Sequence, residues 1–85
     1  MYTEAMKKAV RSFKAPKQFK IDILDYGTFL TIQFYESQWR HYTDAERFKC
    51  IQYLQGVKGA LEKLGARVAL DPILDVKYEN RVERR

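Results

Sequence analysis

Residues 43–64 form the segment with the clearest periodicity in the chain, because their apolar side chains recur every three or four positions. Such spacing lines one side of an α-helix. Thr43 with Glu46 predicts a capping box at its start, and Gly65 predicts a left-handed residue at its end. The chain must therefore bury one side of a long helix. The apolar positions are Phe48, Ile51, Leu54, Val57, Leu61 and Leu64.

The other segments predict a second helix and four strands. Residues 3–14 have an apolar stripe at helical spacing, with Thr3 as the N-cap and Ala15–Pro16 as the stop. Alternation of apolar and polar residues predicts strands at 19–23, 28–36, 66–71 and 73–79, with a turn at Gly27. Residues 1–80 are expected to form one domain, and 81–85 a flexible tail.

The predicted order is α-β-β-α-β-β, which makes the chain an α+β protein. We expect a four-stranded antiparallel sheet with both helices on one face, because each strand has one apolar and one mostly polar side. Moving the last strand to the front gives the ferredoxin-like order, so the chain resembles a circularly permuted ferredoxin-like fold. Two other arrangements remain open: hairpins paired across a dimer, and a simpler α+β layer.

Composition limits the setting in which the chain works. No apolar run reaches the roughly 20 residues that span a bilayer, so no membrane partner is expected. A single cysteine, Cys50, forms no internal disulfide, which favours a reducing, cytoplasmic location. Its position beside the apolar stripe predicts a small, semi-buried hydrophobic residue.

The positive charge is concentrated at the N-terminal end. The net charge is +5, and residues 1–20 carry six basic side chains against one acid, Glu4. A basic row can follow a phosphate backbone, so we expect a small nucleic-acid-binding module. The competing interpretation is a solvated helix face. The candidate contacts are Lys7, Lys8, Arg11, Lys14, Lys17, Lys20 and, outside this segment, Arg40.

Catalysis lacks support in the sequence. The single histidine, His41, lies in a predicted loop, and no nucleophile elbow, metal-ligand cluster or phosphate-binding glycine loop occurs. We therefore expect no enzyme activity, no metal and no cofactor.

A protein-interaction adaptor or inhibitor is the alternative function. Trp39 and Tyr42, next to Arg40, are residue types enriched at interface hot spots, although both equally suit a cap on the core. Phe29 and Tyr35 are expected at the two ends of an open sheet face. A compact chain of this size without recognisable motifs would suit a small regulator of viral or mobile-element origin.

Two glycines interrupt the long helix. Gly56 and Gly59 each cost about 1 kcal/mol relative to alanine in a helix interior. That cost predicts close packing on this side of the helix, either within the fold or across a homodimer. The alternative is a local break in the helix near residues 55–59.

Overall fold

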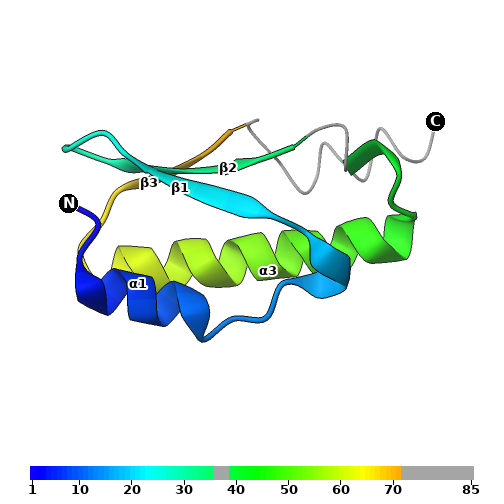
Figure 1. Cartoon of the computed structure of the whole chain (residues 1–85), viewed down its shortest axis with the longest axis horizontal. Helices are drawn as coiled ribbons and strands as arrows, with labels where there is room; N and C mark the ends of the chain where they lie inside the picture. Colours follow the sequence, from blue (N-terminus) through cyan, green and yellow to red (C-terminus); the bar gives the residue numbers. More distant parts are fainter. Residues whose placement is uncertain (36–38, 72–85) are drawn as a thin grey trace.

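The computed structural model describes residues 1–35 and 39–71 (Figure 1). The fold is α+β. The predicted strand at 73–79 and the predicted tail lie outside the described residues. The elements, in order, are α1 (Glu4–Arg11), the 3-10 helix η1 (Pro16–Gln18), β1 (Ile21–Asp25), β2 (Leu30–Phe34), α3 (Asp44–Lys63) and β3 (Val68–Asp71).

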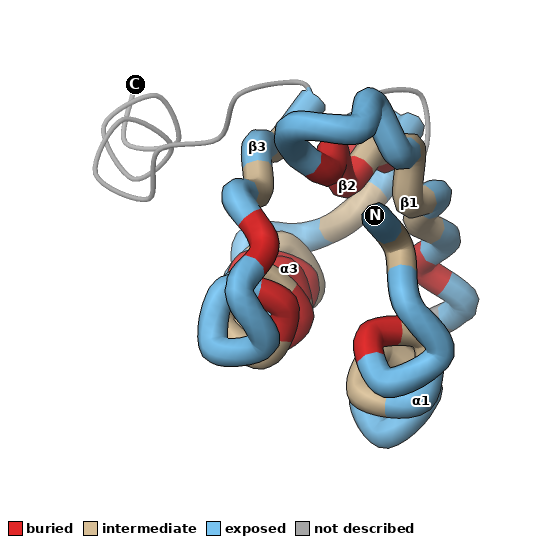
Figure 2. The backbone as a smooth tube through the Cα atoms, turned by 90° about the vertical axis from the view of Figure 1, so that its left-hand side faces the viewer, coloured by how far each residue is buried: buried red, intermediate tan, exposed pale blue. Residues whose placement is uncertain are grey.

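The described strands form one sheet in the order β1-β2-β3. Strand β1 pairs antiparallel with β2, as predicted for the hairpin, whereas β3 pairs parallel with β2. Both helices lie on one side of this sheet, which also agrees with the prediction (Figures 1 and 2). The fold is therefore two layers, with helices covering one face.

The prediction of an all-antiparallel sheet is wrong, because β3 pairs parallel with β2. The fourth predicted strand is not among the described residues, so the number of strands stays a prediction. Helix α3 has 20 residues and is about 30 Å long, so it returns the chain to the end of the sheet where β2 begins. The next strand then runs in the same direction as β2, with Leu30 opposite Val68. A split βαβ unit has a strand between its parallel pair. Here β2 and β3 pair directly, so the described sheet lacks the ferredoxin-like order.

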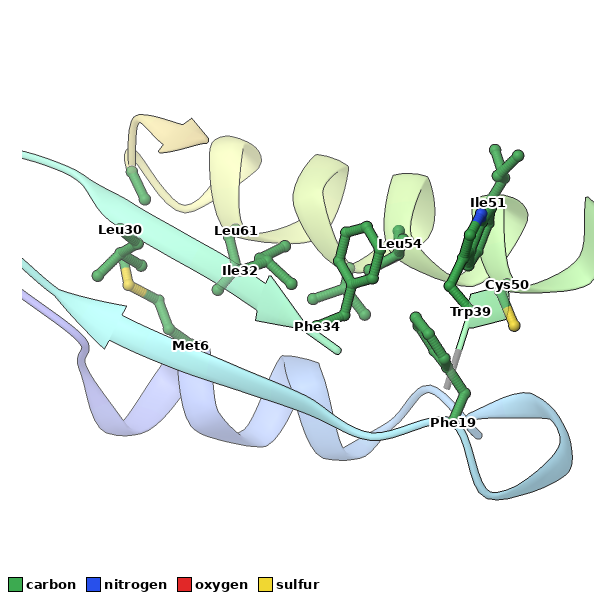
Figure 3. Packing of buried hydrophobic residues seen from close by; sticks show 12 residues of the cluster. Met6, Phe19, Leu30, Ile32, Phe34, Trp39, Cys50, Ile51, Leu54 and Leu61 are labelled. Carbon is green, nitrogen blue, oxygen red and sulfur yellow. The ribbon is translucent and has the colours of Figure 1, made fainter. Parts of the chain in front are cut away.

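The core lies between β2 and α3 (Figure 3). Strand β2 turns alternate residues toward the helices, and α3 turns one side toward β2. Ile32 and Leu54 are completely buried. The other buried apolar residues are Met6, Phe19, Leu30, Phe34, Trp39, Cys50, Ile51, Val57, Leu61 and Ala66.

Two residues of the predicted apolar stripe lie outside the core. Phe48 is 54% exposed and Leu64 is 46% exposed. Phe48 lies six positions before Leu54, which turns Phe48 about 120° away from the buried side of the helix. Leu64 is already the C-cap residue and lies beyond the last turn. The buried part of α3 is therefore shorter than the apolar stripe predicted from the sequence.

The predicted caps are confirmed, and one helix end is corrected. Thr43 Oγ1 accepts a hydrogen bond from the Glu46 amide at 3.2 Å, and Glu46 Oε1 accepts one from the Thr43 amide at 2.8 Å. Gly27 and Gly65 both have positive φ. Helix α1 ends at Arg11, before Pro16 is reached, because Ser12 Oγ donates to the Ala9 carbonyl at 2.6 Å and competes with the helical pattern.

Thr43→Ala removes one half of the capping box. We expect the free energy of unfolding to fall by about 1 kcal/mol, since the Glu46 amide loses its acceptor. Urea denaturation monitored by circular dichroism measures this loss. Thr28→Ala, at an exposed position in the β1–β2 connection, is the control and should change stability by less than about 0.5 kcal/mol. Equal effects from the two substitutions would contradict the role of the cap.

Candidate nucleic-acid interface

Helix α1 turns its basic residues away from the core. Met6 is 1% exposed and marks the buried side of the helix. At 100° per residue, Lys8 and Arg11 lie about 160° and 140° around the axis from Met6. Both are exposed, and Lys14, just after the helix, is exposed too.

Helix α3 adds two lysines to the same side of the molecule. Lys49 and Lys63 are exposed, and they lie about 140° and 180° around α3 from the buried Leu54. This is the side of α3 opposite the sheet, and α1 also lies beneath the sheet (Figure 2). The sequence analysis missed these two lysines, because they lie outside residues 1–20 and acids balance the basic residues in the rest of the chain. Their spacing opposite Leu54 is the signal that identifies them.

Together these residues form what we call the basic helical face. Within the described part of the chain, no hydrogen bond or ion pair to an acid engages any of them. Their charges are therefore available to an anion. The members of the face are Lys8, Arg11, Lys14, Lys49 and Lys63.

Lys7 belongs to the rim of this face. Its ammonium lies 3.4 Å from Glu4 Oε1 and 5.8 Å from the centre of the Tyr2 ring. The predicted basic stripe therefore meets an acid at its N-terminal end. Exposed pairs of this kind contribute little to stability, but they do reduce the charge offered to a partner.

The other predicted basic residues are distributed elsewhere. Lys17 falls in η1. Lys20 directly precedes β1, where alternation with the inward-facing Ile21 and Ile23 puts it on the side of the sheet opposite the helices. Arg40 belongs to the segment 39–42, which lies at the far end of the long axis from α1 (Figure 1). The structure does not bring Lys20 or Arg40 into the basic helical face.

Trp39 and Tyr42 pack against the core. The Trp39 side chain is only 8% exposed, and its ring centre lies 5.7 Å from that of Phe34 (Figure 3). Tyr42 is half-buried, with its ring centre 6.1 Å from that of Phe19. Arg47 covers Trp39 from α3, donating to its carbonyl at 3.2 Å. Of the two roles that the sequence left open for Trp39, the structure shows the cap on the core.

The predicted aromatic residues of the open sheet face are exposed. Phe29 is 40% exposed and stacks on Tyr26, with ring centres 5.1 Å apart and planes 21° apart. Tyr35, at the other end of β2, is 49% exposed and donates to Asp22 Oδ2 at 2.9 Å. That hydrogen bond to a carboxylate raises the pKa of the Tyr35 phenol. Phe29 and Tyr35 are thus separate features, about 20 Å apart along the strand.

The pKa values of Asp25 and Cys50 are also shifted, in each case for structural reasons. Hydrogen bonds from the N-terminal amine and from the Gly27 and Tyr2 amides lower the pKa of Asp25 to about 2. Burial, with the nearby Glu46 carboxylate, raises the pKa of the Cys50 thiol to about 11. The thiol therefore stays protonated and acts as an apolar side chain, as predicted, although it is buried and not semi-buried.

The two helical glycines have different surroundings. A Cβ added at Gly56 would lie 2.8 Å from Cε1 of Phe13, whereas one added at Gly59 would meet nothing within 4 Å. Close packing within the fold therefore accounts for Gly56. Gly59 leaves its side of α3 open, so a homodimer across it stays a prediction.

The described residues contain no group of three or more histidine, cysteine or acidic side chains suited to a metal ion. No helix among them has the length and apolar character needed to cross a membrane.

No family model matches the chain, and no curated protein or solved structure matches it either. Its function is therefore inferred from its own residues.

Because their surroundings differ, Gly56 and Gly59 should differ in how substitution by alanine changes the free energy of unfolding. Gly59→Ala should raise the free energy of unfolding by about 1 kcal/mol, because helix propensity improves without a clash. Gly56→Ala gains the same propensity but must displace the Phe13 ring, so it should gain less or lose stability. In a Phe13→Ala background, Gly56→Ala should recover the full gain. Urea unfolding of the four variants tests this, and equal gains at both glycines in the parent chain would contradict the contact.

Proposed function

We propose that this chain is a small, non-enzymatic nucleic-acid-binding protein that contacts the phosphate backbone through its basic helical face. The observation that carries the proposal is a set of five exposed cations on the helical side of the described structure, four from the two helices and Lys14 just after α1. None of them is paired with an acid among the described residues. Binding releases counterions from the nucleic acid, which supplies affinity without base recognition.

The competing explanation is that these cations serve only the helices themselves. Lys8 and Arg11 lie in the last turn of α1, and Lys63 lies in the last turn of α3, where the helix dipole favours cations. Lys14 lies outside α1, and Lys49 lies in the N-terminal half of α3, so the dipole favours neither. A phosphate partner accounts for all five.

The open face of the sheet is less suited to phosphate. Outward positions of the strands carry Asp22 and Asp71 and no lysine or arginine, although Lys20 and Arg67 flank the sheet. Carboxylates at these positions repel phosphate. The helical side therefore supports nucleic-acid binding better than the sheet side.

The expected setting is the cytoplasm, where a small regulator of this kind binds nucleic acid. The single cysteine, Cys50, can form no internal disulfide, which suits a reducing compartment. This part of the proposal depends on composition.

A second candidate function is docking of a protein with basic and apolar side chains on the sheet side. The observation that favours it is the exposed Tyr26–Phe29 stack, since large exposed aromatic pairs are typical of protein contacts. Asp22 on the same side would attract a basic partner. Trp39, which is buried, would serve this function only by supporting the fold.

The first proposal predicts a defined salt dependence. Lys8→Gln with Arg11→Gln and Lys14→Gln should weaken binding to DNA and lower the slope of log affinity against log salt by about 2 to 3. Fluorescence anisotropy at several salt concentrations measures the slope. Glutamine keeps helix propensity close to that of lysine, and circular dichroism checks the fold.

The matched control for this series is a pair of single substitutions. Lys14→Gln and Arg67→Gln each remove one exposed cation, but only Lys14 lies on the basic helical face. Lys14→Gln should lower the slope by about 1, and Arg67→Gln should leave it unchanged. Equal effects would show that net charge alone governs binding, and absence of binding at low salt would overturn the proposal.

For the second candidate, Tyr26→Ser with Phe29→Ser should abolish capture of a specific protein partner while leaving DNA affinity unchanged. Both rings are exposed, so the variant is expected to fold. Affinity purification followed by mass spectrometry, compared with the Lys8, Arg11 and Lys14 triple variant, provides the measurement. Loss of the same partner in the triple variant but not in the aromatic variant would contradict docking on the sheet.

A further inference from the structure

Phe13 is an exposed aromatic residue at the centre of the basic helical face. Its ring touches the position where Gly56 would carry a Cβ, at 2.8 Å from Cε1 and 3.3 Å from Cδ1. Gly56 lies about 160° around α3 from Leu54, so this contact is on the side of the helix opposite the core. The side chain remains 37% exposed. Phe13 therefore presents part of its ring to solvent on the helical side.

The basic residues surround this ring. Lys14 follows it in the chain, and Arg11 closes the helix just before it. Lys49 and Lys63 each lie seven residues from Gly56 along α3, which is about 10 Å in either direction along the axis. The face therefore has cations on several sides of one aromatic ring.

We infer that the partner is single-stranded nucleic acid, with a base stacked on Phe13 while the surrounding cations hold phosphates. The inference rests on the proposed function and specifies its substrate. Proteins that bind single strands combine a basic surface with an aromatic ring that stacks a base, and the stacking tolerates any sequence. A duplex keeps its bases stacked inside and offers this face only its backbone. None of its bases can therefore stack on Phe13.

Other aromatic residues of the described structure suit this role less well. Trp39 is buried in the core, and Tyr26 and Phe29 lie in the connection between β1 and β2, not on either helix. Phe48 is exposed on α3 but is turned about 100° around the helix from Lys49. Phe13 alone among these combines exposure with cations around it.

The test compares a 12-nucleotide thymidine oligonucleotide with an abasic oligonucleotide of the same length. Both carry the same phosphates, so any difference in affinity comes from the bases. We expect the parent chain to bind the thymidine strand at least about fivefold more tightly, the lower end of the stacking contribution per base. Fluorescence anisotropy over a salt series measures both affinity and slope.

Phe13→Leu should abolish this preference while leaving the salt slope unchanged, because leucine keeps an apolar contact with Gly56 but offers no ring to stack on. Phe48→Leu is the matched control, since it removes an exposed phenylalanine of α3, and it should keep the preference. Thermal unfolding of both variants verifies that they fold.

The possible outcomes distinguish failure of this inference from failure of the proposed function. Equal affinity of the parent chain for the two strands, or tighter binding of a duplex than of the thymidine strand, overturns the inference and leaves the proposed function intact. A preference that survives Phe13→Leu overturns the assignment to Phe13. Absence of binding to any of these nucleic acids at low salt overturns both.

Discussion

The packing of β2 on α3 is the interaction on which the rest of the structure depends. Ile32 from the strand and Leu54 from the helix are completely buried against this interface. Strand β2 is paired on both edges and covered by helices on one face, so it organises the sheet and the core together. Helix α1 has only eight residues, too few for a stable helix in isolation, so it depends on packing against this unit.

The same packing creates the proposed binding face. Each helix turns one side to the core, and the opposite side is left to solvent. Cations on those outer sides come together because both helices cover the same face of the sheet. Phe13, just after α1, contacts Gly56 on the outer side of α3, and part of its ring stays exposed. The contact between Phe13 and Gly56 therefore contributes both to the packing of the fold and to the proposed binding face.

Features that depend on neighbouring residues were predictable from the sequence. The Thr43 capping box, the positive φ of Gly27 and Gly65, and the alternation in β2 all involve short stretches of chain, and all are confirmed. Predictions that depended on distant residues were less reliable. Whether Trp39 caps the core, and how far the stripe on α3 extends toward Phe48, depends on what the fold places opposite them. The contribution of Lys49 to the basic face also required the position of α1.

The sequence by itself determined the α+β class, the helix caps and the concentration of positive charge near the N-terminus, because propensity, periodicity and charge are local properties of the chain. Only the tertiary structure decided that β3 pairs parallel with β2, and that Phe13 packs on Gly56. Alternation specifies which side of a strand is buried, but it is the same for parallel and antiparallel neighbours. The choice between them comes from the length and packing of α3, which brings residues far apart in sequence into register.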